Sequence, residues 1–372
     1  MPVSKRTGLF TFVIILLMTF ILAGCGGGST TNQNTGSTTS SQSSSATSLD
    51  GAGGTFPAPL YTKWFAVYSQ LTGVEVNYQP VGSGNGITDI TEGTVDFGAS
   101  DAIMTQEQQA TAEAQHGPIL HIPMATGSVA LIYNIPGVTN NEQLKLTPDV
   151  LADIYLKNIK NWNDPRITEI NPGLTLPDLP IEVVYRADAS GTTFIFTNYL
   201  SKVSTQWATQ VGNATSVSWP GDVGGNLSSG VAAAVKQTPG TIGYVELSYA
   251  LQNNMTMASL ENAAGNYITP SVDSTAAAAN GVDLPVDMKI MLTNSTDPNA
   301  YPIVGYTWIL VYVNQTNKSK GEALASMLWW AIHDGQQYEA PLDYAPLTSA
   351  AVALAEKEIE SINNQGQPFI QK

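Results

Sequence analysis

The chain has 372 residues, of which 43% are hydrophobic and 12% charged, and its formal net charge is −15. This hydrophobic share suffices for a full core in one or two domains and excludes a chain that is disordered throughout. The acidic balance excludes a nucleic-acid or anionic-membrane partner held by diffuse electrostatics, and any anionic ligand must therefore be held by short-range donors in a sheltered site.

The N-terminal segment predicts export and anchoring. Lys5 and Arg6 precede an apolar run that ends in small residues before Cys25, the single cysteine of the chain. This pattern predicts a lipoprotein signal peptide over residues 1–24, with Cys25 acylated as the first residue of the mature chain. A retained transmembrane helix is the weaker alternative, because the run is shorter than the ~20 residues that span a bilayer. Residues 25–50, rich in Gly, Ser and Thr, are expected to form a flexible tether.

Beyond the tether, helix-like and strand-like segments alternate, which is typical of an α/β fold with mainly parallel strands. Apolar residues at helical spacing predict a helix over 60–71, and strict alternation predicts a strand over 74–78. Thr147 followed by proline predicts a capped helix start. We expect further strands at 94–98, 119–122, 129–133, 181–185 and 306–313, and further helices at 104–114, 322–333 and 347–362.

The apolar strands at 129–133 and 306–313 bracket the middle of the chain, which predicts two lobes. One lobe combines residues 51–128 with 305–372, and the other is the inserted block 129–304. Two crossing strands would join them, and this layout makes a hinge with a ligand cleft between the lobes.

Three segments place hydroxyl residues and glycines where a helix is expected to begin. They are 53–57, 81–87 and 186–194. The free N–H groups and partial positive charge of a helix start bind oxyanions without a cationic side chain. The alternative for each segment is an ordinary capped helix start. The hydroxyl groups that could add donors are those of Thr55, Ser83, Ser190 and Thr192.

Arg186 directly follows an expected strand, at the strand end where open α/β sheets bind ligands. Its planar guanidinium can donate to two oxygens of an anion, and Asp188 could hold it in place through a charge-assisted hydrogen bond. The alternative is an ordinary Arg–Asp pair on the surface.

Asp101 also follows an expected strand. A carboxylate beside an anion is useful when the anion carries a proton, because hydrogen phosphate can donate to it and sulfate cannot. An unpaired acceptor facing a negative oxygen costs on the order of 1 to 3 kcal/mol. Asp101 would therefore select phosphate. The alternative role is a cap for the helix expected at 104–114.

Catalytic and metal sites find no support. The three histidines show no metal-ligand spacing, and neither a nucleophile elbow nor a phosphate-binding P-loop occurs. The sequence predicts no enzyme, no metal and no cofactor, and its seven tryptophans are expected to serve packing.

Four motifs in order, at 51–59, 95–101, 186–192 and 242–246, closely resemble the phosphate-binding protein of the Pst-type ABC importer. The resemblance implies a two-lobed periplasmic-binding-protein fold of type II that closes over phosphate and docks on the membrane subunits of an ABC permease. In the loop at 82–86, Gly84 and Asn85 depart from the serine and glycine expected there. Asp101 is implied to accept the proton of the ligand, and Asp188 to orient Arg186. The implied donors to phosphate are Thr55, Phe56 through its backbone, Ser83, Arg186, Ser190, Gly191 and Thr192.

We therefore expect an extracytoplasmic, lipid-anchored monomer that binds inorganic phosphate with high affinity and delivers it to an ABC permease. Three alternatives stay open. They are a binding protein for another tetrahedral oxyanion such as sulfate or molybdate, a phosphoester hydrolase that uses the same cradle, and a module that senses phosphate without transport.

Overall fold

The computed structural model describes residues 47–140 and 142–371. The expected signal peptide, the acylation of Cys25 and most of the tether lie outside the described residues. Strand β1 (Ser48–Gly53) begins inside the segment expected to be tether, because its backbone pairs in parallel with a strand on each side. Within the described ranges, no helix is both long enough and apolar enough to cross a bilayer.

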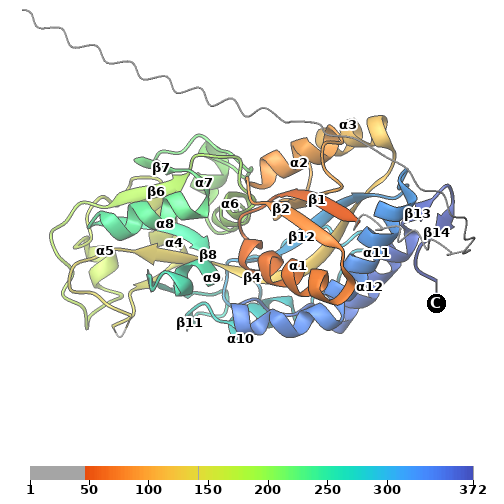
Figure 1. Cartoon of the computed structure of the whole chain (residues 1–372). Coiled ribbons are helices and arrows are strands. Elements are labelled where there is room, and N and C mark those ends of the chain that lie inside the picture. The colour runs from red at the N-terminus through yellow and green to blue at the C-terminus, as the bar shows by residue number, and fades with distance from the viewer. Residues whose placement is uncertain (1–46, 141, 372) are drawn as a thin grey trace, which may run out of the picture. The chain divides into compact units, whose positions relative to one another are not determined.

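One nine-stranded sheet forms the centre of the described chain (Figure 1). The spatial order is β2 (Glu75–Gln79), β1, β3 (Phe97–Ser100), β12 (Val304–Tyr312), β4 (Ile119–Tyr133), β8 (Thr241–Glu246), β6 (Glu182–Arg186) and β7 (Val223–Gly225), with β9 (Thr256–Met257) also on β4. Pairing is parallel at both ends of the sheet, among β1, β2 and β3 and among β6, β7 and β8, and antiparallel around β12 and β4. The expected parallel pairing therefore holds only away from the middle.

Strand β4 belongs to both ends of this sheet. Its residues 119–128 pair with β12 and its residues 129–133 pair with β8. We call β2, β1, β3, β12 and residues 119–128, with the loops and helices that directly follow these strands, the first half-sheet. Residues 129–133 with β8, β6, β7 and β9, and the loops and helices that directly follow them, form the second half-sheet. The lobe boundaries expected from the sequence stay a prediction.

The sequence predicted two separate strands where β4 is continuous. Pro123 interrupts the expected pattern because it has no N–H for the ladder. The pairing register shifts at this point, with Trp308 opposite Pro123 and Thr307 opposite Ala125. This β-bulge accommodates the proline, so the strand continues past it.

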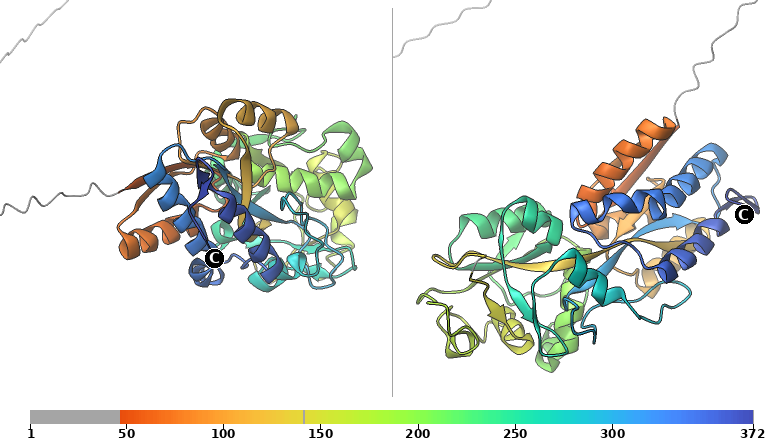
Figure 2. Two further views of the ribbon diagram at one scale, coloured as in Figure 1. Left: turned by 90° about the vertical axis from the view of Figure 1, so that its right-hand side faces the viewer. Right: turned by 90° about the horizontal axis from the view of Figure 1, so that it is seen from below.

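Helices lie on both sides of the sheet (Figure 2). The expected helix starting at Thr147 is confirmed as α4, because the Thr147 side chain accepts a hydrogen bond from the N–H of Val150. The helices are α1 (Ala58–Thr72), α2 (Ser83–Thr91), α3 (Gln106–His116), α4 (Pro148–Tyr155), α5 (Pro165–Thr168), α6 (Gly191–Val203), α7 (Thr205–Gln210), α8 (Leu227–Gln237), α9 (Leu247–Gln252), α10 (Val272–Ala279), α11 (Lys318–Ile332) and α12 (Ser349–Ser361).

Short elements complete the chain. They are the strands β5 (Lys145–Leu146), β10 (Ser259–Glu261), β11 (Tyr267–Ile268), β13 (Asn363–Asn364) and β14 (Gln367–Pro368), and the 3₁₀ turns η1 (Asp334–Tyr338) and η2 (Ala340–Leu342). Apolar side chains fill the space between sheet and helices. As expected, tryptophans serve this packing, and the fully buried ones are Trp64, Trp162, Trp207 and Trp308.

Candidate functional site

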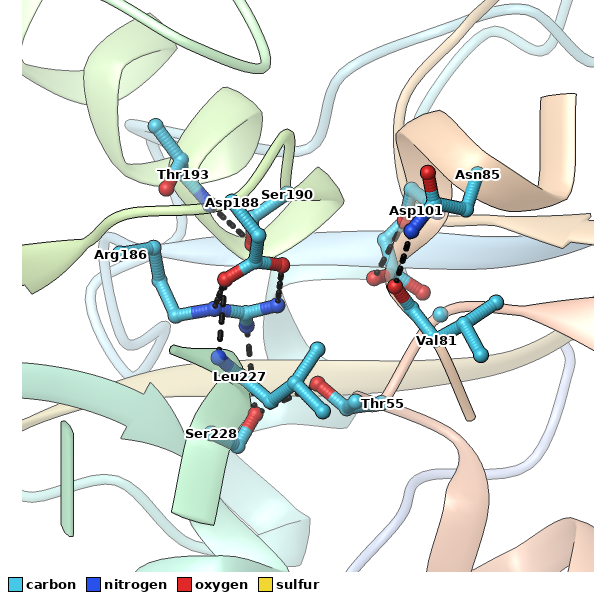
Figure 3. A network of polar contacts seen from close by, with 12 residues as sticks. Thr55, Val81, Asn85, Asp101, Arg186, Asp188, Ser190, Thr193, Leu227 and Ser228 are labelled. Atoms are coloured by element: carbon cyan, nitrogen blue, oxygen red, sulfur yellow. Dashed lines mark hydrogen bonds and ion pairs between the residues drawn. The ribbon is translucent and has the colours of Figure 1, made fainter. Parts of the chain in front are cut away.

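Polar residues from both half-sheets meet at the carboxyl ends of four strands (Figure 3). Thr55 follows β1, Asp101 follows β3, Arg186 is the last residue of β6, and β7 leads into the start of α8. Each of these three side chains is buried. Ligands of open α/β sheets bind at carboxyl ends of strands, so the sheet places these residues where a site is expected.

Phe56 fixes the loop between β1 and α1. Its ring packs against the backbone of β4 so closely that a Cβ added at Gly127 would lie 2.5 Å from it. The hydroxyl of Tyr344 donates to the Phe56 carbonyl at 2.6 Å. The residue before α1 is Pro57, which offers no capping side chain. No side chain caps this helix start, and its first N–H, that of Ala58, donates to the carbonyl of Thr55 at 3.3 Å.

Ser83 is the first residue of α2. Gly82 precedes it at φ 98°, a backbone conformation that glycine adopts readily and residues with a Cβ disfavour. The N–H of Gly84 donates to the carbonyl of Ala189 at 2.9 Å, which joins the two half-sheets. A Cβ at Gly84 would lie 2.4 Å from the Ala189 Cβ. The departure from the expected serine therefore has a steric reason in this chain.

Asp101 is surrounded by donors. Thr307 on β12 donates to its Oδ1 at 2.8 Å, and Ser83 donates to its Oδ2 at 3.3 Å. Burial raises the pKa of the Asp101 carboxyl from 3.8 to about 7, against the hydrogen bond of Thr307 and the positive charge of Arg186. The carboxyl can therefore accept or donate a proton near neutral pH.

The alternative role of Asp101, as a helix cap, is wrong. Helix α3 is capped by Thr105, whose side chain accepts from the N–H of Gln108 while the Gln108 side chain accepts from the N–H of Thr105. The Asp101 side chain is thus directed to the site.

Arg186 is buried and Asp188 partly buried, so they do not form an ordinary surface pair. The guanidinium Nε and Nη2 donate to the two carboxylate oxygens at 2.8 and 2.5 Å, and only 2% of the Arg186 side chain is exposed. The N–H of Leu227 at the start of α8 also donates to Asp188, at 2.9 Å. Burial alone would raise the pKa of Asp188, but the hydrogen bond and charge of Arg186 hold it below its usual range. Asp188 therefore stays ionised and fixes the orientation of the guanidinium.

The start of α6 brings the second half-sheet against the first. Ser190 acts as an ordinary cap, because its Oγ accepts from the N–H of Thr193 at 3.2 Å. The Thr192 hydroxyl is buried and, within the described part of the chain, has no hydrogen-bond partner. A Cβ at Gly191 would lie 2.5 Å from the Ser83 Oγ and 2.6 Å from the Asp101 Cβ. Only glycine permits this approach.

Contacts join the predicted residues in two groups: Ser228 links Thr55 to Arg186 and thus to Asp188, and Gly191 lies against Ser83 and Asp101. Ser228, the second residue of α8, and Thr307 were not among the predicted residues, although both touch the others. Ser228 follows a Gly-Gly-Asn segment of the kind that identified the other helix starts, so a search for that pattern would have found it. Thr307 is one polar residue in an apolar strand and has no comparable local pattern. The predicted set is Thr55, Phe56, Ser83, Asp101, Arg186, Asp188, Ser190, Gly191 and Thr192.

This arrangement suits a small oxyanion. The starts of α1, α2, α6 and α8 supply N–H groups and partial positive charge, and one oriented guanidinium adds a full charge. One acceptor, Asp101, stands among these donors. Such a set can hold a tetrahedral anion by direct hydrogen bonds, and it distinguishes anions by whether they carry a proton.

Comparison with known proteins identifies the family. The PBP superfamily domain matches residues 36–328. The chain is 41% identical over 360 residues to the phosphate-binding protein PstS of Xylella fastidiosa, covering 94% of this chain and 96% of that one. It is 44% identical over 309 residues to PstS of Pasteurella multocida, covering 82% and 88%. With PstS of Methanocaldococcus jannaschii it shares 36% identity over 358 residues, covering 91% of this chain and 90% of that one.

The fold also matches solved structures. A periplasmic phosphate-binding protein bound with phosphate, PfluDING, superposes with a TM-score of 0.69 at 21% identity, covering 86% of this chain and 96% of that one. A phosphate-binding protein from Stenotrophomonas maltophilia gives a TM-score of 0.68 at 19% identity, covering 87% and 96%. The expected two-lobed periplasmic-binding fold is confirmed, and the chain belongs to the PBP superfamily and, within it, to the family of PstS phosphate-binding proteins.

Proposed function

We propose that this chain binds inorganic phosphate outside the cytoplasm and delivers it to an ABC import permease. The observation that carries the proposal is the buried Asp101 carboxyl, which accepts hydrogen bonds from Ser83 and Thr307 and lies against Gly191 at the start of α6. The chain matches relatives named phosphate-binding protein over nearly their full length. Membership in a solute-binding family supports a role in capture and transport, without catalysis.

In this proposal the first half-sheet contributes Thr55, Ser83 and the N–H of Phe56 as donors. The second contributes the Arg186 guanidinium and the donors at the start of α6, namely Ser190, Gly191 and Thr192. The buried Thr192 hydroxyl supports this assignment, because a buried hydroxyl without a protein partner costs free energy that an anion oxygen would recover. Asp188 orients Arg186 and does not touch the ligand.

Asp101 gives the site its preference for phosphate. Hydrogen phosphate donates its proton to the carboxylate, whereas fully ionised sulfate places an unprotonated oxygen against it. The mismatch costs on the order of 1 to 3 kcal/mol, and more where the two negative charges are desolvated. Molybdate is disfavoured for the same reason.

The remaining parts of the proposal concern place and assembly. The acylated Cys25 would anchor a monomeric chain at the membrane, next to its permease. Residues 51–128 with 305–372 would form one lobe and 129–304 the other, with phosphate held between them. Mass spectrometry of the protein purified from membranes tests the anchor, since acylation adds lipid mass to the peptide that begins at Cys25.

Isothermal titration of the phosphate-free protein with phosphate, sulfate and molybdate at pH 8 tests the ligand. We expect one phosphate per chain and at least about 100-fold weaker binding of the other two anions, equivalent to about 2.7 kcal/mol. Equal affinity for sulfate would contradict the assignment, and turnover of a chromogenic phosphoester would contradict a pure binding role.

A further inference from the structure

Ser228 lies between two of the proposed phosphate donors. It is the second residue of α8 and only 1% exposed. Its Oγ lies 3.3 Å from Nη1 of Arg186 and 2.7 Å from Oγ1 of Thr55 (Figure 3). Thr55 belongs to the first half-sheet, whereas Arg186 and Ser228 belong to the second, so this chain of contacts crosses between them.

The chemistry of the three groups fixes the direction of one hydrogen bond and favours one direction for the other. A guanidinium only donates, so Ser228 must accept from Arg186. The proton of Ser228 is then available to Thr55, whose Oγ1 lies 2.7 Å away. The reverse order would give Ser228 two donors and leave its own proton without an acceptor among the contacts described for it. Thr55 therefore keeps its proton for another acceptor.

We propose that Ser228 is a positioning residue that fixes the direction in which the Thr55 hydroxyl donates its hydrogen bond. The positive charge of Arg186 polarises the Ser228 hydroxyl, which in turn directs the Thr55 O–H toward the bound anion. Hydrogen bonds in such a chain strengthen one another. The inference rests on the proposed function, because it assigns a task to Ser228 in phosphate binding.

Two consequences follow for the ligand. Thr55 acts only as a donor and so favours an unprotonated oxygen at its corner of the site, which leaves the proton of phosphate for Asp101. In addition, the bond between Ser228 and Thr55 joins the two half-sheets directly. Its loss should therefore act mainly on the rate at which phosphate leaves.

The test compares Ser228→Ala with Ser229→Ala, which alters the next residue of α8 at an exposed position. Phosphate affinity is measured by isothermal titration, and the dissociation rate by stopped-flow fluorescence. We expect Ser228→Ala to weaken binding at least fivefold, mostly through faster dissociation, and Ser229→Ala to stay within twofold of the wild type. The melting temperature should fall whichever role Ser228 has, because two buried hydrogen bonds are lost, so phosphate affinity and dissociation are compared at a temperature where every variant is fully folded. A purely structural role would leave both binding quantities unchanged there.

A double-mutant cycle isolates the coupling between Ser228 and Thr55. Thr55→Val removes the receiving hydroxyl, and the combined variant should bind phosphate more tightly than the product of the two single effects predicts. Ser228→Cys keeps the shape with a weaker donor and should give an intermediate affinity. Independent effects, or full affinity in either Ser228 variant, would overturn the inference and leave the proposed function intact. Failure of the wild type to bind phosphate would instead overturn the proposed function.

Discussion

Asp101 is a carboxyl among donors, so its protonation state governs which oxyanion fits beside it. Burial raises its pKa to about 7. Above that pH the carboxylate repels sulfate, and below it the neutral acid can donate to sulfate. We expect sulfate to bind about tenfold more tightly at pH 6 than at pH 8, following the protonated fraction of Asp101. The affinity for phosphate should change less between these pH values, because one proton shared between phosphate and the carboxyl satisfies the contact whichever of the two supplies it.

Asp101→Asn provides the control for this pH profile. An amide donates at every pH, so sulfate affinity should rise and lose its pH dependence, and the preference for phosphate should fall. Competition titrations at pH 6 and pH 8 measure both. A preference that survives this substitution unchanged would show that other groups select the anion.

Arg186 supplies the one full positive charge described in this cluster. Arg186→Ala should weaken phosphate binding by about 2 kcal/mol or more, because a desolvated charge-assisted hydrogen bond is lost and Asp188 is left buried without its partner. Titration calorimetry measures the loss. Arg166→Ala is the matched control, since Arg166 pairs with Asp153 and Asp164 on the surface. Comparable losses in both variants would indicate a general effect of net charge.

At the level of elements, the sequence predicted three of the four helix starts at the site. Their glycines and hydroxyl residues form a recognisable pattern, because glycine lets the backbone approach a ligand closely and a helix start offers free N–H groups. The start of α8 has the same composition but was not recognised, because β7 before it has only three residues and gives no alternating pattern. Thr307 reaches Asp101 across 206 residues of sequence, a contact that only the folded sheet creates.

The start of α6 tests whether the close approach of the half-sheets is needed for binding. Gly191→Ala places a methyl group against Ser83 and Asp101. We expect phosphate affinity to fall by at least about 100-fold, or about 2.7 kcal/mol, since the start of α6 can no longer approach Ser83 and Asp101 while each half-sheet keeps its own packing. Gly173→Ala is the control, because a Cβ there meets no atom within 4 Å. Full affinity in Gly191→Ala would mean that the two sides do not meet around the ligand.

For the whole molecule, the sequence predicted two lobes and most helices and strands, because apolar periodicity reports burial directly. It did not predict that one sheet runs through the molecule. The proline and the bulge within β4 hide its continuity from any pattern that assumes regular alternation.

Stability without phosphate should depend on pH through Asp101. Its pKa in the folded state is raised from 3.8 to about 7, so its contribution is fully present below pH 3.8 and is lost as pH rises through 7. The difference of about 3 units corresponds to about 4 kcal/mol at most. Urea unfolding in phosphate-free buffer should show that the wild type loses more stability from pH 5 to pH 8 than Asp101→Asn does. Parallel curves would contradict the shifted pKa.

Strand β4 has a practical consequence for anyone who wishes to divide this protein. Both half-sheets hydrogen-bond to the same fifteen-residue strand, 119–133. A cut or an inserted reporter there would disturb the pairing of β4 with β12 and with β8 at the same time. Fragment complementation and sensor insertions should therefore be placed in surface loops away from this strand, since no stretch of it serves as a dispensable linker.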